Sequence, residues 1–292
     1  MLTVAQAFEL FVQDLRLRDG EEREAQRQQE YVFNAMRQRL GPKESILSGS
    51  YGRKTAIRPL HDIDLFLIFS AGGSRRAVPE AMLLWVKEAL EDEFRGKQAR
   101  IQNRSVNIEF KTTGIGFDVV PAIADGKHPE VYWIPDRRRG EWIPSNPRAH
   151  HAACNAANER MGMKLKPLIK SLKRWNQLRG KPVPSFLLEV LVCECGDSLS
   201  PDDGYSDNMA RLFTLLRERI SQRCPEPAGL GPPLNEGIDL GYLQQDQQRL
   251  TEASRKAIRA VEMEHQGNMS LALESWRELL GTDFPVRLSR SV

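Results

Sequence analysis

The chain has 292 residues, of which 40% are hydrophobic and 28% are charged. This is the composition of a globular protein with one large domain or two interlocked lobes, and it does not favour disorder. Lys and Arg exceed Asp and Glu only slightly, 42 against 39, so the composition does not indicate a surface coated for nucleic-acid binding.

The apolar segments of the chain are short. None approaches the roughly 20 residues needed to cross a bilayer, and the first residues lack the pattern of a secretory signal. The four cysteines show no paired CxxC spacing, which is typical of free thiols in a reducing compartment. We therefore predict a cytoplasmic protein with no membrane partner.

The first half of the chain predicts two helices followed by a mixed α/β core. Apolar residues recur at helical spacing from Val4 to Leu15, and the more polar stretch from Glu21 to Leu40 also reads as a helix. After Ser45 come four short β-rich segments, ILSGS, DIDLFLIF, VNIEF and GFDVVPAI. An amphipathic helix is expected between the second and third of them, over Val78 to Phe94.

The second half is predicted to be helical. A stretch rich in Pro, Trp and Arg, residues 124–150, is expected to be an irregular crossing between two lobes. The helices expected after it are His150–Met161, Leu165–Leu178, Ser185–Glu194, Met209–Ser221, Gln247–Glu264 and Met269–Leu280. We predict an α+β fold with a core lobe at 1–146, which includes the N-terminal helices, and a helical lobe at 147–292.

The segment HDIDLFLIF places two carboxylates on one face of a strand. Successive side chains of a strand alternate between its faces, so Asp62 and Asp64 point one way while Ile63 points into the core. Two carboxylates so close resist joint ionisation, and a divalent ion such as Mg²⁺ relieves the conflict. Asp118, in the apolar segment GFDVVPAI, is a third candidate ligand. Two metal ions bound this way would support phosphoryl transfer to a hydroxyl.

A glycine-containing turn precedes the paired carboxylates. Gly49 lets backbone N–H groups approach phosphate oxygens, and Ser50 can add a hydroxyl donor. The string GSYGRKTAIRPLHDIDLFLIF therefore predicts a triphosphate cradle followed by a metal site.

In this order, the motifs resemble the DNA polymerase β-like nucleotidyltransferase superfamily, in which GS and DxD are followed by one distant carboxylate. The run from NPRAHHAACN to SFLLEVLV resembles the helical lobe of bacterial CD-NTases, relatives of cyclic GMP-AMP synthase and oligoadenylate synthase. The likeness covers about residues 45–195.

The resemblance implies roles for individual residues. Gly49 and Ser50 would hold the donor triphosphate, while Asp62, Asp64 and Asp118 would bind two Mg²⁺ ions, with Mn²⁺ as a substitute. Lys173 of SLKRWN and Ser185 of VPSFLLE match the residues that grip the β and γ phosphates in this family. Lys166 and Lys170 are the alternatives to Lys173, and a solvated helix face is the plain alternative for all three lysines.

The resemblance also implies an activity and partners. The expected enzyme joins nucleoside triphosphates, ATP and also GTP, UTP or CTP, into a cyclic di- or trinucleotide messenger and releases pyrophosphate. Such an enzyme would act in bacterial anti-phage (CBASS) signalling, where a separate effector receives the product. An accessory protein and an activating nucleic acid are further expected partners, although catalysis itself would not require nucleic acid.

Two other functions remain open from the sequence. Archaeal-type CCA-adding enzymes share GS, DID and an FDVVP-like strand, so the chain could extend RNA without a template. Those enzymes carry large RNA-binding domains, which this length and charge do not favour. A catalytically inactive nucleotide sensor is the second alternative, disfavoured because all three carboxylates are present.

Overall fold

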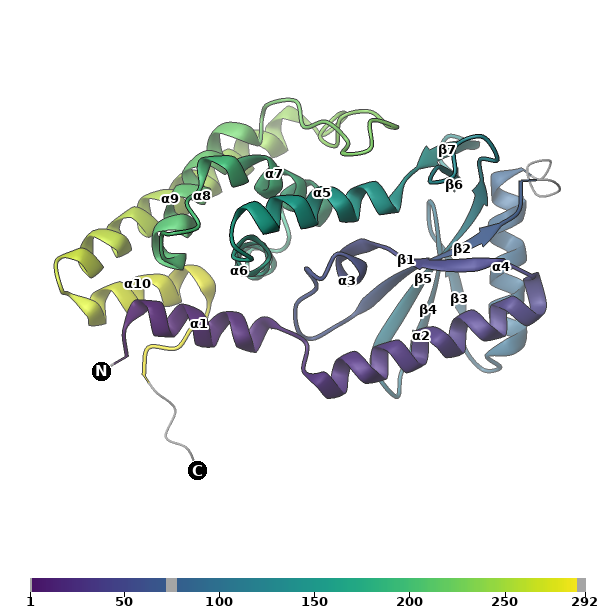
Figure 1. Cartoon of the computed structure of the whole chain (residues 1–292), viewed down its shortest axis with the longest axis horizontal. Coiled ribbons are helices and arrows are strands. Elements are labelled where there is room, and N and C mark those ends of the chain that lie inside the picture. Colours follow the sequence, from purple (N-terminus) through teal and green to yellow (C-terminus); the bar gives the residue numbers. More distant parts are fainter. Residues whose placement is uncertain (1, 72–77, 288–292) are drawn as a thin grey trace. The chain divides into compact units, whose positions relative to one another are not determined.

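The structure, a computed structural model, describes residues 2–71 and 78–287. The chain divides into two units (Figure 1). A sheet unit comprises Leu17–Ala152 and Pro227–Gly231, and a helical unit comprises Met1–Arg16, Ala153–Glu226 and Pro232–Val292. A mixed sheet with flanking helices, together with a separate set of helices, confirms the predicted α+β class.

A mixed sheet forms the centre of the sheet unit. Within the described residues it has the strand order β1-β2-β5-β4-β3, with β6 added beside β5 and β7 beside β6. Among the strand pairs of the described residues, β2 and β5 are parallel and the others are antiparallel. The strands are β1 (Glu44–Leu47), β2 (Asp62–Phe69), β3 (Ala99–Ile101), β4 (Val106–Phe110), β5 (Ile115–Ala124), β6 (Tyr132–Asp136) and β7 (Glu141–Ser145).

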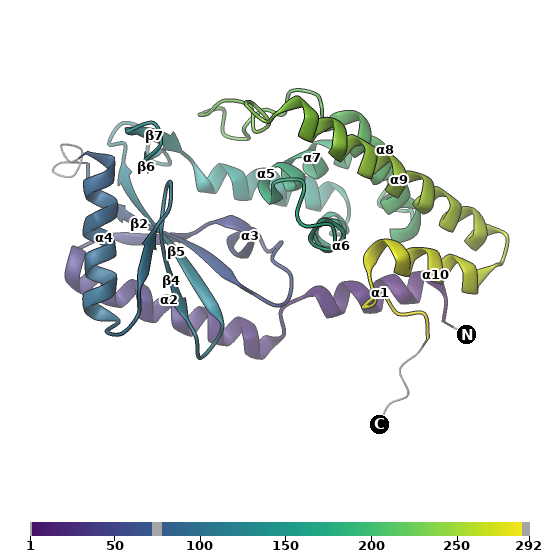
Figure 2. The ribbon, with the colours of Figure 1, turned by 180° about the vertical axis from the view of Figure 1, so that it is seen from behind.

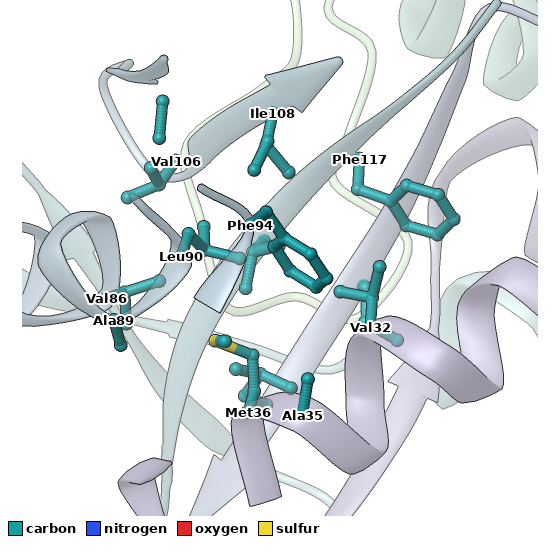
Figure 3. Close-up of a cluster of buried hydrophobic side chains, with 14 of the residues drawn as sticks. Val32, Ala35, Met36, Val86, Ala89, Leu90, Phe94, Val106, Ile108 and Phe117 are labelled. Atoms are coloured by element: carbon teal, nitrogen blue, oxygen red, sulfur yellow. The ribbon is translucent and has the colours of Figure 1, made fainter. Parts of the chain in front are cut away.

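Two helices cover one face of this sheet. Helices α2 (Asp19–Leu40) and α4 (Pro79–Glu93) contribute Val32, Met36 and Leu90 to a core shared with the strands, shown in Figure 3. Side chains of β2 and β5 that point to this face are fully buried, which the apolar alternation of the sequence predicted. Figure 2 shows the sheet and its two helices from behind.

The opposite face of β2 changes character along the strand. Its first two side chains on this face are Asp62 and Asp64. The next two, Phe66 and Ile68, join a second apolar cluster with residues of β5 and β6. The acidic residues therefore lie where the apolar cover of this face ends.

Residues 124–150 are not the irregular crossing expected from the sequence. They complete β5 and form a hairpin of β6 and β7 in which Trp133 pairs with Pro144 and Pro135 pairs with Trp142. Proline cannot donate to a ladder but is tolerated in edge strands, and Pro144 lies in β7, which pairs only with β6 in the described sheet. Pro135 lies beyond Tyr132 and Trp133, the residues of β6 that pair with β5. Proline content alone was therefore a misleading signal.

The helical unit is built from helices in the second half of the chain and one from its start. Helix α5 begins in the sheet unit and ends in the helical unit. The helices are α1 (Val4–Leu15), α5 (Pro147–Arg160), α6 (Leu165–Gln177), α7 (Ser185–Cys195), α8 (Tyr205–Arg219), α9 (Leu240–His265) and α10 (Met269–Leu280). Helix α9 starts earlier than predicted because Asp239 caps it, accepting a hydrogen bond from the Gly241 N–H.

Helix α1 belongs to the helical unit. The ring of Phe8 packs edge-on against Trp276 at 4.9 Å and against Phe284 at 5.0 Å between centroids. The sequence-based division had placed both N-terminal helices with the sheet, because an amphipathic pattern shows that a face is buried but not what covers it. Among residues 2–71 and 78–287, no helix is both long and apolar enough to span a membrane.

Candidate active site

The sheet brings the three predicted carboxylates together. Parallel pairing of β2 with β5 sets Asp64 directly beside Asp118 and Asp62 beside Gly116. Neighbouring strands lie about 4.8 Å apart, and paired residues project to the same face. Asp62, Asp64 and Asp118 therefore share one surface, on the side of the sheet away from α2 and α4.

Gly49 lies against the carboxylate of Asp64. The Ser48 N–H donates to the Asp64 carbonyl at 2.8 Å, and the chain then turns into the short helix α3 (Gly49–Gly52). Gly49 has φ of +58°, and a Cβ on it would stand 1.6 Å from Asp64 Oδ2. Both the backbone conformation and the close approach exclude a larger residue.

Ser50 is held in the same turn. Its carbonyl oxygen accepts hydrogen bonds from the N–H groups of Thr55 and Ala56 at 2.9 and 3.0 Å, and its side chain is half-buried. The structure thus places the GS turn beside the acidic surface, as the sequence order suggested. The binding of a triphosphate by Gly49 and Ser50 remains a prediction.

A second glycine makes room for Asp62. A Cβ on Gly116 would lie 2.7 Å from Asp62 Oδ1 and 3.4 Å from the Asn107 side-chain nitrogen. The Gly116 N–H also donates to the carbonyl of His61 at 2.5 Å. Sequence reasoning missed Gly116, although it directly precedes the FDVVP segment.

The environment of Asp118 perturbs its carboxyl group. Burial raises the pKa of its carboxyl group, and the nearby charge of Asp62 raises it further. A hydrogen bond from the Asn107 side chain opposes this rise, because a donor favours the ionised form. Asn107 Nδ2 donates to Asp118 Oδ1 at 2.9 Å.

Asn107 was also missed from the sequence. The signal was present in VNIEF, where Asn107 is a polar residue in an otherwise apolar strand and is only 5% exposed. A buried amide needs a partner. Which partner it has depends on the register of β4 with β5, where Asn107 stands opposite Asp118.

The carboxylate surface fits a hard divalent cation by its chemistry. Three oxygen-rich side chains on adjoining strands are the donor set that Mg²⁺ prefers, and their mutual repulsion gives a cation a reason to bind. In the described residues, no three His, Cys, Asp or Glu side chains converge on one point as a formed site requires. The backbones of Asp64 and Asp118 already adjoin in the β2–β5 pair.

The helical unit holds the other predicted residues. Lys173, on α6, is buried, and its Nζ donates to Glu189 Oε1 on α7 at 2.9 Å. Ser185 is exposed in the first turn of α7, after Pro184. Their role in phosphate binding stays a prediction.

The alternatives to Lys173 lie on the same helix. Lys166 is half-buried and donates to Asn155 Oδ1 at 2.6 Å. Lys170 is half-buried as well. Neither therefore lies on a fully solvated helix face.

Comparison with known proteins identifies the family. Residues 1–158 match the model of the Second Messenger Oligonucleotide or Dinucleotide Synthetase domain. This match spans more than half of the chain. The protein belongs to this family, the bacterial CD-NTases.

Individual relatives agree with the assignment. A cyclic AMP-AMP-AMP synthase of an Acinetobacter strain is 30% identical over 82% of this chain and 72% of its own length. A probable cyclic nucleotide synthase of Bacillus cereus is 25% identical over 83% of this chain and 82% of its own. The fold matches Escherichia coli CdnC, solved in complex with a HORMA protein, with a TM-score of 0.79 at 17% identity, covering 96% of this chain and 98% of that one.

Family membership confirms the predicted class of activity. The CD-NTase is an enzyme, a nucleotidyltransferase that makes cyclic oligonucleotides from nucleoside triphosphates, and its relatives belong to CBASS signalling. The relatives described above are named as nucleotide synthases, so the RNA-extending alternative has no support from them. Enzymes of this class use divalent metal ions.

Proposed function

We propose that this CD-NTase converts ATP into a cyclic oligoadenylate and releases one pyrophosphate for each linkage formed. The observation that carries the proposal is the register of β2 with β5, which sets Asp64 beside Asp118 while Gly49 lies against Asp64. This arrangement joins a glycine turn suited to phosphate with a carboxylate surface suited to metal ions.

The proposed reaction is a nucleotidyl transfer. A ribose hydroxyl oxygen of one nucleotide forms a bond to the α-phosphorus of a triphosphate, and the bond from that phosphorus to the pyrophosphate oxygen breaks. The hydroxyl proton passes to solvent water as the new bond forms. Repetition builds a linear oligoadenylate that keeps the triphosphate of its first nucleotide. Its terminal ribose hydroxyl then attacks the α-phosphorus of that triphosphate, which releases the last pyrophosphate and closes the ring.

Each predicted site residue of the sheet unit has a proposed part in this transfer. Gly49 keeps the space beside Asp64 open and, with Ser50, holds the donor triphosphate. Asp62 and Asp64 would bind two Mg²⁺ ions, and Asp118 would bind the one nearer the acceptor hydroxyl. When bound, such ions lower the pKa of the hydroxyl and balance charge on the leaving pyrophosphate. Mn²⁺ is the proposed substitute.

The proposed phosphate contacts of the helical unit are Ser185 and Lys173. An ammonium group carries three donors, so a hydrogen bond from Lys173 to Glu189 is compatible with a second one to a phosphate. Glu189 would then hold the lysine in one orientation. Lys166 and Lys170 remain the alternatives.

ATP is proposed as the substrate because the Acinetobacter relative, 30% identical, is named for an all-adenylate product. GTP, UTP and CTP are the competing substrates. We further propose that an accessory protein acts with the enzyme, since E. coli CdnC was solved with a HORMA protein. Nucleic acid is a further proposed activator. A separate effector protein is proposed to receive the product.

The test is incubation of the purified protein with each of the four nucleoside triphosphates, singly and together, with Mg²⁺ or Mn²⁺. Parallel reactions contain double-stranded DNA or tRNA. Products are treated with phosphatase, and their masses are measured by mass spectrometry. ATP alone should yield pyrophosphate and a phosphatase-resistant ring of adenylates. Extension of tRNA without a free product, or a ring that requires another base, would overturn the corresponding part of the proposal.

A further inference from the structure

We propose that Asn107 is a positioning residue that holds the Asp118 carboxylate in the orientation needed to bind metal. The inference rests on the proposed function, because it presumes that Asp118 is a metal ligand. Asn107 lies in the predicted strand VNIEF but is not among the predicted site residues.

Asn107 is placed by the sheet and cannot easily move. It stands opposite Asp118 in the antiparallel pair of β4 and β5, is 5% exposed, and donates from Nδ2 to Asp118 Oδ1 at 2.9 Å. The same nitrogen lies 3.4 Å from the position that a Cβ would take on Gly116. Asp62 Oδ1 lies 2.7 Å from that position. Asn107 therefore sits beside both carboxylates while donating to one.

There is a physical reason for an amide, and not a guanidinium, to hold Asp118. Asp136, a buried aspartate in the same unit, is held by the Arg104 guanidinium at 3.0 Å and by Asn103 at 3.2 Å. A guanidinium neutralises the carboxylate that it holds and so competes with a metal ion. An amide fixes the direction of the oxygen atoms and leaves the full negative charge, which suits a carboxylate that binds a cation.

The contrast supplies a matched pair of variants. Asn107→Leu removes the amide donor to Asp118, and Asn103→Leu removes an amide donor to Asp136. Mn²⁺ binding is measured for each by electron paramagnetic resonance, with a non-hydrolysable ATP analogue present, alongside thermal unfolding. We expect Asn107→Leu to weaken Mn²⁺ binding by about 10- to 100-fold, the usual cost of losing a partner of a metal ligand. Asn103→Leu should destabilise the fold and leave the Mn²⁺ affinity unchanged.

A second variant protects the test against misfolding. Asn107→Ala removes the same donor without adding an apolar branch, so it should fold and weaken Mn²⁺ binding to a similar extent, by about 10- to 100-fold. In both variants the Mg²⁺ concentration that gives half-maximal pyrophosphate release should rise, with the KM for ATP at saturating Mg²⁺ little changed.

The outcomes distinguish failure of the positioning role from failure of the proposed function. Wild-type Mn²⁺ affinity in folded Asn107→Leu or Asn107→Ala would overturn the positioning role. If the wild-type protein itself bound no Mn²⁺ and released no pyrophosphate, the proposed function would fail instead. Equal weakening in Asn103→Leu and Asn107→Leu would show general damage to the sheet and would also overturn the inference.

Discussion

The acidic surface of the sheet unit and the buried ion pair of the helical unit arrange charge in opposite ways. Asp62 and Asp118 carry like charges close enough for one to raise the pKa of the other. Lys173 and Glu189 carry opposite charges 2.9 Å apart, and both are buried. The first arrangement opposes folding and gives a cation a reason to bind, whereas the second is compensated within the protein.

The largest expected effect is on activity and comes from the acidic surface. Asp64→Ala should lower pyrophosphate release in Mg²⁺ by about 10³-fold or more, because it removes a ligand from the proposed metal site. The melting temperature should stay the same or rise, since a like charge is removed. Asp92→Ala, at an exposed acid of α4, serves as the control and should retain activity. Equal turnover in the two variants would remove Asp64 from the site.

The next largest effect is on stability and comes from the ion pair. Glu189→Ala leaves Lys173 buried without this partner, and we expect a loss of about 3–5 kcal/mol in the free energy of unfolding by urea. The double variant Lys173→Met with Glu189→Leu should regain most of that loss, because apolar replacements often substitute for a buried pair.

The same double variant tests the proposed phosphate contact of Lys173. If the ammonium grips the triphosphate, the KM for ATP should rise about tenfold or more, as expected for the loss of a charge-assisted hydrogen bond. An unchanged KM in the folded double variant would assign the pair wholly to folding.

A smaller effect on activity is expected at Gly49. A Cβ there must displace the Asp64 carboxylate, so Gly49→Ala should reduce pyrophosphate release by about 10²-fold, the cost of misplacing a group by about 1 Å. Gly41 is the control, because its φ of +70° is similarly strained for alanine while nothing lies within 4 Å of its Cβ position. Gly41→Ala should cost about 1 kcal/mol of stability and keep its activity. Equal losses of activity would show strain alone to be the cause.

The smallest expected effect is a gain in stability. Asp118→Asn keeps the shape and removes the buried charge, so without metal its melting temperature should exceed that of the wild type by about 1–4 °C. The pKa of Asp118 is raised in the folded protein, so ionised Asp118 destabilises the wild-type fold at pH values above that pKa. This destabilisation disappears as the pH falls through the raised pKa towards the ordinary value of 3.8. Thermal scans across pH 3–7 would show the gap closing; a gap that widens at low pH would contradict this assignment.

The sequence determined the local features of the site. The alternation in DIDLFLIF places Asp62 and Asp64 on one face because strand periodicity involves only consecutive residues. A glycine before the paired acids marked the turn, and the motif order indicated the family that the comparison confirmed. Most helices were predictable for the same reason, since their apolar spacing is a local pattern.

Tertiary structure alone decided which distant residues meet. The positions of Asp118 beside Asp64 and of Asn107 opposite Asp118 depend on strand pairing, which arises from burial of the whole sheet. The attachment of α1 to the helical unit and the pairing of Lys173 with Glu189 depend likewise on contacts far apart in the chain. Periodicity specifies which face of a segment is buried, and only packing selects the partner that buries it.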